Sequence, residues 1–157
     1  MSPVKKIPIL ACLRILLGIF FVLVGGSKLL APYQNFLYVV QSYEVFPPLL
    51  QEFAARFVPW IEFFLGIFLI LGLWSKPVLI ALLCLVTGFI LTLGQAILRG
   101  LPIDSCGCFG SWLPVPIRTM LAIDDCLWLL INLMLIRLKS TSLLSFDNHF
   151  AKINKAG

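Results

Sequence analysis

Four long runs of apolar residues dominate the chain, and most polar residues lie between them. The runs cover residues 7–30, 57–74, 77–98 and 116–137. Each is close to the about 20 residues that an α-helix needs to cross roughly 30 Å of hydrocarbon. Because the runs carry few charged residues, the pattern predicts an all-α fold, an integral membrane four-helix bundle.

Aromatic residues mark the connection between the first two runs. Phe36, Val40 and Tyr43 recur at helical spacing, and Pro47-Pro48 follow them. Aromatic side chains of this kind favour the boundary between membrane and water. We therefore expect a short interfacial helix in this first outer loop, ended by the two prolines.

The basic residues predict how the chain sits in the membrane, because lysine and arginine favour the cytoplasmic ends of spanning helices. With both termini inside, seven lie on the inner side and four on the outer side. They are Lys5, Lys6, Lys76, Arg137, Lys139, Lys152 and Lys155 inside, and Lys28, Arg56, Arg99 and Arg118 outside. We expect an inner (plasma) membrane protein with cytoplasmic N- and C-termini, one domain over residues 1–140, and a polar cytoplasmic tail over 141–157.

Composition agrees with the membrane prediction. Hydrophobic residues make up 61% of the chain and charged residues 12%, with a mean hydropathy of +1.04, whereas soluble domains are about 45–50% apolar and about 25% charged. The net charge of +5 comes from residues at the ends of the runs. It therefore points to membrane lipid as the surrounding partner and not to nucleic acid.

Ionisable residues occur within the runs or at their ends, where an unpaired charge at mid-membrane costs about 2.5–3.5 kcal/mol or more. We therefore expect an inward-facing polar core. Lys28 and Glu62 should pair near the outer interface, and an Arg14–Asp125 pair is within reach. A purely structural role for these charges stays open, as does proton transfer by the adjacent acids. The full set is Arg14, Lys28, Glu62, Arg118, Asp124 and Asp125.

Small or polar residues form a stripe along each run. We expect all four stripes to face inward, because small residues let helices approach closely and ionisable residues avoid lipid. The stripes are Arg14, Gly18, Gly25 and Lys28; Glu62 and Gly66; Cys84, Gly88, Thr92 and Gln95; and Arg118, Asp125 and Asn132.

The loop over residues 99–115, which the predicted orientation places on the periplasmic or extracellular side, contains Cys106-Gly107-Cys108. A disulfide across one glycine closes a tight ring, and strained, exposed disulfides are more oxidising and more labile than structural ones. The pair therefore favours thiol–disulfide exchange.

Three other interpretations of the cysteine pair stay open. A structural disulfide spanning one residue would restrain little chain. A zinc site needs four nitrogen or sulfur ligands, but the chain's one histidine, His149, lies in the inner tail, so we expect no metal. In the third interpretation the two cysteines are free thiols that are unrelated in function. The remaining cysteines, Cys12, Cys84 and Cys126, are expected to be small apolar fillers.

Several short motifs follow one another along the chain, and their order resembles the MauE/DoxX-like family of small four-helix membrane proteins. The resemblance covers roughly residues 8–138, and the CGCFG motif after the third run is typical of the methylamine utilisation MauE branch. The matching residues are Arg14, Gly18, Phe21, Gly25, Lys28, Tyr43, Pro47, Pro48, Pro59, Glu62, Gly66, Cys106, Gly107, Cys108, Phe109, Gly110 and Arg118.

This resemblance implies a redox pair at Cys106 and Cys108, and a polar framework of Arg14, Lys28, Glu62 and Arg118. MauE-type proteins are associated with disulfide formation in the small subunit of methylamine dehydrogenase, alongside a thioredoxin-like partner. DoxX relatives are linked to quinone as an electron acceptor. The resemblance therefore implies a thioredoxin-like or disulfide-containing periplasmic partner and quinone as a cofactor.

The sequence thus predicts a membrane thiol–disulfide oxidoreductase that exchanges electrons between a periplasmic dithiol protein and quinone. Phe109, Trp112 and Gln95 are the candidate quinone-binding residues. One alternative is a non-catalytic assembly or interaction subunit for a periplasmic redox protein. Another is a disulfide oxidase of the DsbB or vitamin K epoxide reductase type, although such proteins normally carry CxxC.

Overall fold

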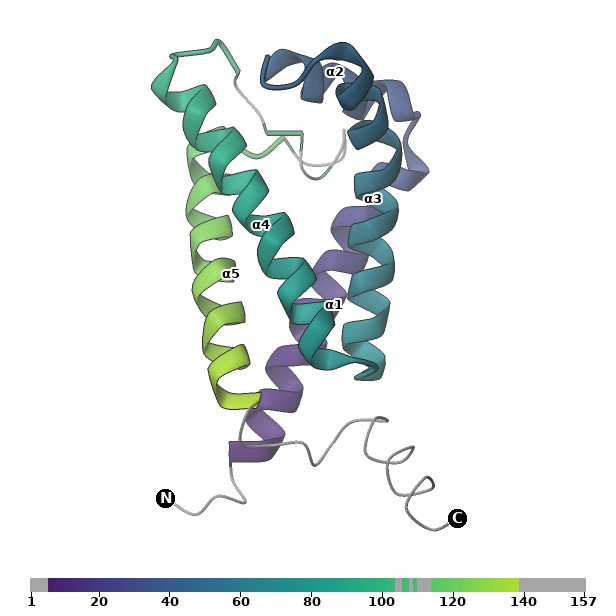
Figure 1. Ribbon diagram of the computed structural model, residues 1–157, viewed down its shortest axis with the longest axis vertical. Helices are drawn as coiled ribbons and strands as arrows, with labels where there is room; N and C mark the ends of the chain where they lie inside the picture. Colours follow the sequence, from purple (N-terminus) through teal and green to yellow (C-terminus); the bar gives the residue numbers. More distant parts are fainter. Residues whose placement is uncertain (1–5, 104–105, 108, 110–113, 139–157) are drawn as a thin grey trace.

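The computed structural model describes residues 6–103, 106–107, 109 and 114–138, and within them the chain forms five α-helices (Figure 1). Four of these helices, α1, α3, α4 and α5, are each long and apolar enough to cross a membrane. The predicted all-α fold with four spanning helices is confirmed, and the chain is a multi-pass membrane protein. The helices are α1 (Lys6–Leu30), α2 (Tyr33–Ser42), α3 (Pro48–Leu71), α4 (Ser75–Leu98) and α5 (Ile117–Leu138).

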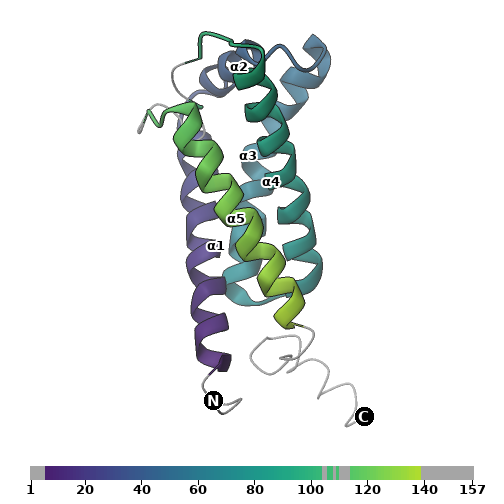
Figure 2. The ribbon, with the colours of Figure 1, turned by 90° about the vertical axis from the view of Figure 1, so that its left-hand side faces the viewer.

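The two ends of the bundle differ. The start of α1 and the end of α5 lie together at one end, here called the terminal end (Figures 1 and 2). The short helix α2 and the segment that carries Cys106 lie at the opposite end, here called the cysteine end. The short helix predicted in the first loop is α2.

Small residues bring α1 and α3 into backbone contact. A Cβ atom at Gly66 would lie 2.8 Å from the carbonyl oxygen of Gly18 and 2.8 Å from the backbone nitrogen of Val22. A Cβ atom at Gly25 would lie 2.7 Å from the backbone nitrogen of Phe63. The small-residue stripes predicted on the first two runs therefore face each other, as close packing of helices in lipid requires.

The helices α4 and α5 pack together as a second pair, and apolar side chains fill the space between the two pairs. Lipid tails are as apolar as this core, so van der Waals packing and not the hydrophobic effect holds the pairs together. The core residues are Leu17, Phe21, Leu69, Val78, Leu79, Leu82, Val86, Ile131 and Met134.

Helix α3 differs from its predicted bounds of 57–74. It begins at Pro48 and ends before Gly72, which adopts a left-handed φ of 70°. Proline is favoured in the first turn of a helix, where its missing N–H would have no partner. Pro47 and Pro48 therefore open α3, whereas the sequence suggested that they end α2, which stops at Ser42.

The other three spanning helices begin and end within two residues of the predicted 7–30, 77–98 and 116–137. The tail predicted over residues 141–157 lies outside the described residues.

Candidate functional site at the cysteine end

Two hydrogen bonds hold Cys106 in place, and a third holds one of its partners. The N–H of Cys106 donates to the carbonyl of Val115 at 3.1 Å, and its carbonyl accepts a hydrogen bond from the hydroxyl of Tyr43 at 2.9 Å. The carbonyl of Tyr43 in turn accepts from Nε2 of Gln95 at 2.9 Å. Cys106 is also buried, since the residue is 2% exposed.

Two features of the structure require glycine at position 107. Its φ of +63° lies in the left-handed region, which side chains with a Cβ atom rarely adopt. A Cβ atom there would also lie 2.5 Å from Cγ2 of Val39 on α2. The residue between the two cysteines therefore lets the loop press directly against α2.

A buried ion pair lies below this loop. The Lys28 ammonium group contacts both carboxylate oxygens of Glu62, at 2.9 and 2.8 Å, and the two side chains are 1% and 0% exposed. The ammonium group also lies 4.7 Å from the ring centroid of Phe36 and 5.3 Å from that of Phe89, where ring faces attract cations. The predicted Lys28–Glu62 pair is confirmed.

The position of this pair along α3 differs from the prediction. Because α3 begins at Pro48, Glu62 lies 14 residues inside the helix, about 21 Å along its axis. It does not begin the helix at the outer interface. The pair is thus in the interior of the bundle.

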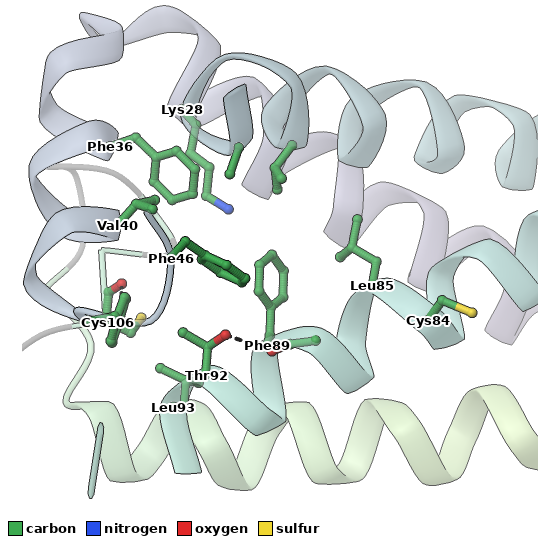
Figure 3. Close-up of a pocket in the computed structure, with 14 residues that line it drawn as sticks. Lys28, Phe36, Val40, Phe46, Cys84, Leu85, Phe89, Thr92, Leu93 and Cys106 are labelled. Carbon is green, nitrogen blue, oxygen red and sulfur yellow. Dashed lines mark hydrogen bonds between the residues drawn. The ribbon is translucent and has the colours of Figure 1, made fainter. Parts of the chain in front are cut away.

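An apolar pocket of about 250 Å³ connects the ion pair to the cysteine loop. Cys106 lies at one end of it and Cys84 at the other, and the Lys28 amine points between the Phe36 and Phe89 rings (Figure 3). Residues of α1, α2, α3 and α4 line its walls. The pocket therefore places an apolar cavity beside one of the two cysteines.

The two adjacent acids of α5 face in different directions. Asp124 is 2% exposed, lies close enough to Lys28 and Glu62 for their charges to act on it, and its Oδ2 has no hydrogen-bond partner among the described residues. Asp125 is exposed. The interior of the bundle thus contains a third ionisable side chain, and it is Asp124.

Arg14 is not brought to Asp125. A Cβ atom at Gly72 would lie 2.8 Å from both terminal nitrogens of Arg14, so the guanidinium group lies against the end of α3 at the terminal end. Asp125 lies eight residues after the start of α5, nearer the cysteine end. The two groups therefore lie at different depths in the bundle.

The fourth predicted stripe is wrong. Arg118 and Asp125 are exposed, whereas Met120, Asp124, Ile131 and Met134 are buried. A spacing of seven drifts relative to the 3.6-residue period of a straight helix, and packing of the apolar residues decides which face of α5 turns inward. Arg118 is consequently absent from the polar interior.

The third predicted stripe, on α4, has a different role from the one expected. Cys84, Gly88 and Thr92 line the pocket. A Cβ atom at Gly88 would meet nothing within 4 Å, so this glycine does not bring a neighbouring helix close. Gln95, expected near a quinone, donates its hydrogen bond to Tyr43. Cys84, Gly88 and Thr92 thus form one wall of the pocket, and Gln95 holds Tyr43 in place.

Three residues of the predicted site remain to be placed. The ring of Phe109 packs edge-on against Phe20 at 5.8 Å and contacts the cluster around Cys106. Cys108 and Trp112 lie outside the described residues. Among the described residues, no group of three or more His, Cys, Asp or Glu side chains is close enough to hold a metal ion.

Sequence reasoning missed the roles of Tyr43, Val39 and Phe89. Tyr43 entered only through the motif order and its aromatic spacing, yet its hydroxyl holds the cysteine loop. Phe89 and Val39 have no distinguishing pattern, because apolar residues in a membrane protein face lipid, core and cavity alike. The one signal in the sequence was the order of motifs, in which Tyr43 precedes Cys106-Gly107-Cys108; the structure joins the two through the Tyr43 hydroxyl.

Comparison with known proteins adds the family. The model of the methylamine utilisation protein MauE family matches residues 6–144. The chain belongs to the MauE family. The predicted resemblance to the MauE branch is confirmed, and the match includes all five helices and every residue of the cysteine end described above.

A curated relative supports the assignment. The methylamine utilization protein MauE of Paracoccus denitrificans is 30% identical over 117 residues, which cover 74% of this chain and 62% of the relative. This chain thus aligns with less than two thirds of that MauE protein. No solved structure matches the chain.

Proposed function

We propose that this MauE-family protein is a membrane thiol–disulfide oxidoreductase whose redox pair is Cys106 and Cys108. The observation that carries the proposal is the placement of Cys106. It is fixed by Tyr43 and Val115 and is one of the residues that line an apolar pocket inside the bundle. A purely structural cysteine has no need of both a reactive neighbour in sequence and a cavity beside it.

In the proposed reaction a thiolate of a dithiol partner protein attacks the Cys106–Cys108 disulfide and forms a mixed disulfide. The partner's second thiolate then displaces the protein's sulfur. The partner leaves as a disulfide. Cys106 and Cys108 are left as two thiols, which have taken up the partner's two electrons and, by exchange with solvent, two protons.

Return to the disulfide requires an acceptor of two electrons and two protons. A membrane quinone supplies that chemistry by becoming a quinol, which leaves the S–S bond reformed. The apolar pocket supports an acceptor from the lipid phase. Asp124 is the buried acid that the interior offers for proton transfer, because it lies one helical turn from Met120, and Met120 packs with Cys106.

The proposed orientation places the cysteine end on the periplasmic or extracellular side of the plasma membrane, where disulfides persist. The partner is then a thioredoxin-like or disulfide-containing protein of that compartment. Family membership supports a role in methylamine utilisation, through the disulfides of a periplasmic enzyme.

A decisive experiment compares the parent with the Cys106→Ser/Cys108→Ser double variant. Purified protein in lipid nanodiscs is given a reduced thioredoxin-like dithiol protein and decylubiquinone, and dithiol loss is followed. We expect quinone-dependent oxidation by the parent and background rates with the double variant. Equal rates, together with full function of the double variant in cells, would instead establish an assembly subunit.

A further inference from the structure

The pocket under Cys106 has one charged residue among the described residues that line it. That residue is Lys28. An ammonium group has three N–H donors, and Glu62 accepts from two of them, one at each carboxylate oxygen. Among the described residues, no acceptor other than Glu62 takes a hydrogen bond from Lys28, so one N–H donor remains. Figure 3 shows the nitrogen pointing into the space between the Phe36 and Phe89 rings.

The other walls suit a flat, apolar molecule. Phe36 and Phe46 lie on the α2 side and Phe89 on α4, so aromatic rings surround the donor (Figure 3). Such rings favour offset or edge-on contacts with another ring. A volume of about 250 Å³ is slightly below the roughly 300 Å³ at the small end of ligand sites, which accommodates a ring headgroup better than a whole lipid.

The pocket also has a side opening toward the membrane. Gly88 lines it and is exposed on the surface of α4, and a Cβ atom there would meet no other atom within 4 Å. A long apolar tail can leave at this point while the headgroup stays near Lys28. Cys106 lies on the wall at one end of the same pocket (Figure 3).

We propose that this pocket is the quinone site of the protein, with Lys28 donating a hydrogen bond to a carbonyl oxygen of the headgroup. The inference rests on the proposed function, because it identifies where the acceptor of that reaction binds. The net reaction balances: two cysteine thiols and one quinone give one disulfide and one quinol, and both electrons and both protons leave the sulfur atoms for the quinone oxygens. The pocket thus replaces Phe109, Trp112 and Gln95 as the proposed headgroup site.

A pair of glycines on α4 allows a matched test of binding. Gly88→Leu places a side chain in the opening of the pocket. Gly94→Leu is the control, because a Cβ atom at Gly94 also meets nothing within 4 Å and Gly94 does not line the pocket. Protein in nanodiscs is irradiated with an azido-ubiquinone analogue, and the labelled peptides are identified by mass spectrometry.

We expect label on peptides that contain Phe36 or Phe89. Gly88→Leu should lower the apparent affinity about tenfold or more, equivalent to about 1.4 kcal/mol, and Gly94→Leu should leave it unchanged. Val40→Phe, which fills the pocket from α2, provides a second variant if Gly88→Leu lowers the yield of folded protein. Label elsewhere, or equal labelling of all variants, would overturn the proposal.

Two further measurements distinguish a quinone site from a general acyl-chain site and test quinone binding separately from the redox function. Excess oleic acid that displaces the analogue as well as decylubiquinone does would make the pocket a general acyl-chain site and overturn the proposal. The Cys106→Ser/Cys108→Ser variant should keep its label, because binding needs no thiol. If that variant keeps both its label and full function in cells, the redox function fails while the quinone site stands.

Discussion

At the residue scale, Gly107 is the position where the geometry most clearly requires the residue that the sequence has. Its left-handed backbone and its contact with Val39 both exclude a side chain. A strained backbone of this kind costs about 1–3 kcal/mol, so a Cβ atom should push the cysteine loop away from α2 and uncover Cys106.

We therefore predict that Gly107→Ala speeds alkylation of reduced Cys106 by about tenfold, the factor for 1.4 kcal/mol. Gly100→Ala is the matched control, because Gly100 also has a positive φ of 64° but nothing within 4 Å of its Cβ position. Adding Val39→Ala should partly reverse the effect. Equal alkylation rates for the two alanine variants would show that the contact with Val39 is unimportant.

The Lys28–Glu62 pair gives a second prediction. Breaking a buried pair by removing one partner costs about 3–5 kcal/mol, because it leaves an uncompensated buried charge. Lys28→Met and Glu62→Gln should each lower the thermal unfolding temperature in detergent. The Lys28→Met/Glu62→Gln double variant should lose less than the sum of the two, and strictly additive losses would contradict the pairing.

Asp124 and Asp125 form a natural comparison, since they are adjacent but only Asp124 is buried. If Asp124 transfers protons, Asp124→Asn should slow quinone-dependent dithiol oxidation about tenfold or more. Asp125→Asn should leave the rate near that of the parent. A reduced rate for both variants, or for neither, would remove Asp124 from the proposed reaction.

At the scale of the helices, contact between α1 and α3 positions the ion pair, because Lys28 lies on one and Glu62 on the other. Gly66→Ala would place a Cβ atom 2.8 Å from the Gly18 carbonyl oxygen, and overpacking of this kind costs about 1–3 kcal/mol. We predict a lower thermal unfolding temperature than for Gly94→Ala on open α4. Indistinguishable melting curves would argue against tight α1–α3 packing.

The helices also show what the sequence could and could not predict. Long apolar runs fix the spanning helices, and isolated charges at Lys28 and Glu62 predict their own pairing, because lipid offers no other partner. The start of α3 was misplaced because the polar residues before Phe57 resemble a loop. The inward face of α5 was misassigned because its core-facing and lipid-facing residues are equally apolar.

At the scale of the whole molecule, the pocket could not be predicted from the sequence. It forms where α2 covers the cysteine end and α4 leaves Gly88 open, so it depends on how helices distant in sequence meet. Cys106 and Cys108 could be singled out because reactive residue types are rare in so apolar a chain. Phe89 had no comparable signal, and the spacing of Phe36 predicted an interfacial helix and not the wall of a pocket.

The central claim is that Cys106 and Cys108 cycle between disulfide and dithiol on the outer side of the membrane. The most direct measurement is thiol trapping in intact cells with a membrane-impermeant maleimide, in a variant whose other cysteines are replaced. We predict that the pair is mostly oxidised when quinone is plentiful. We also predict that it becomes reduced and labelled from outside when quinone synthesis is blocked. A pair that stays reduced in both conditions, or that only a membrane-permeant reagent reaches, would contradict the account.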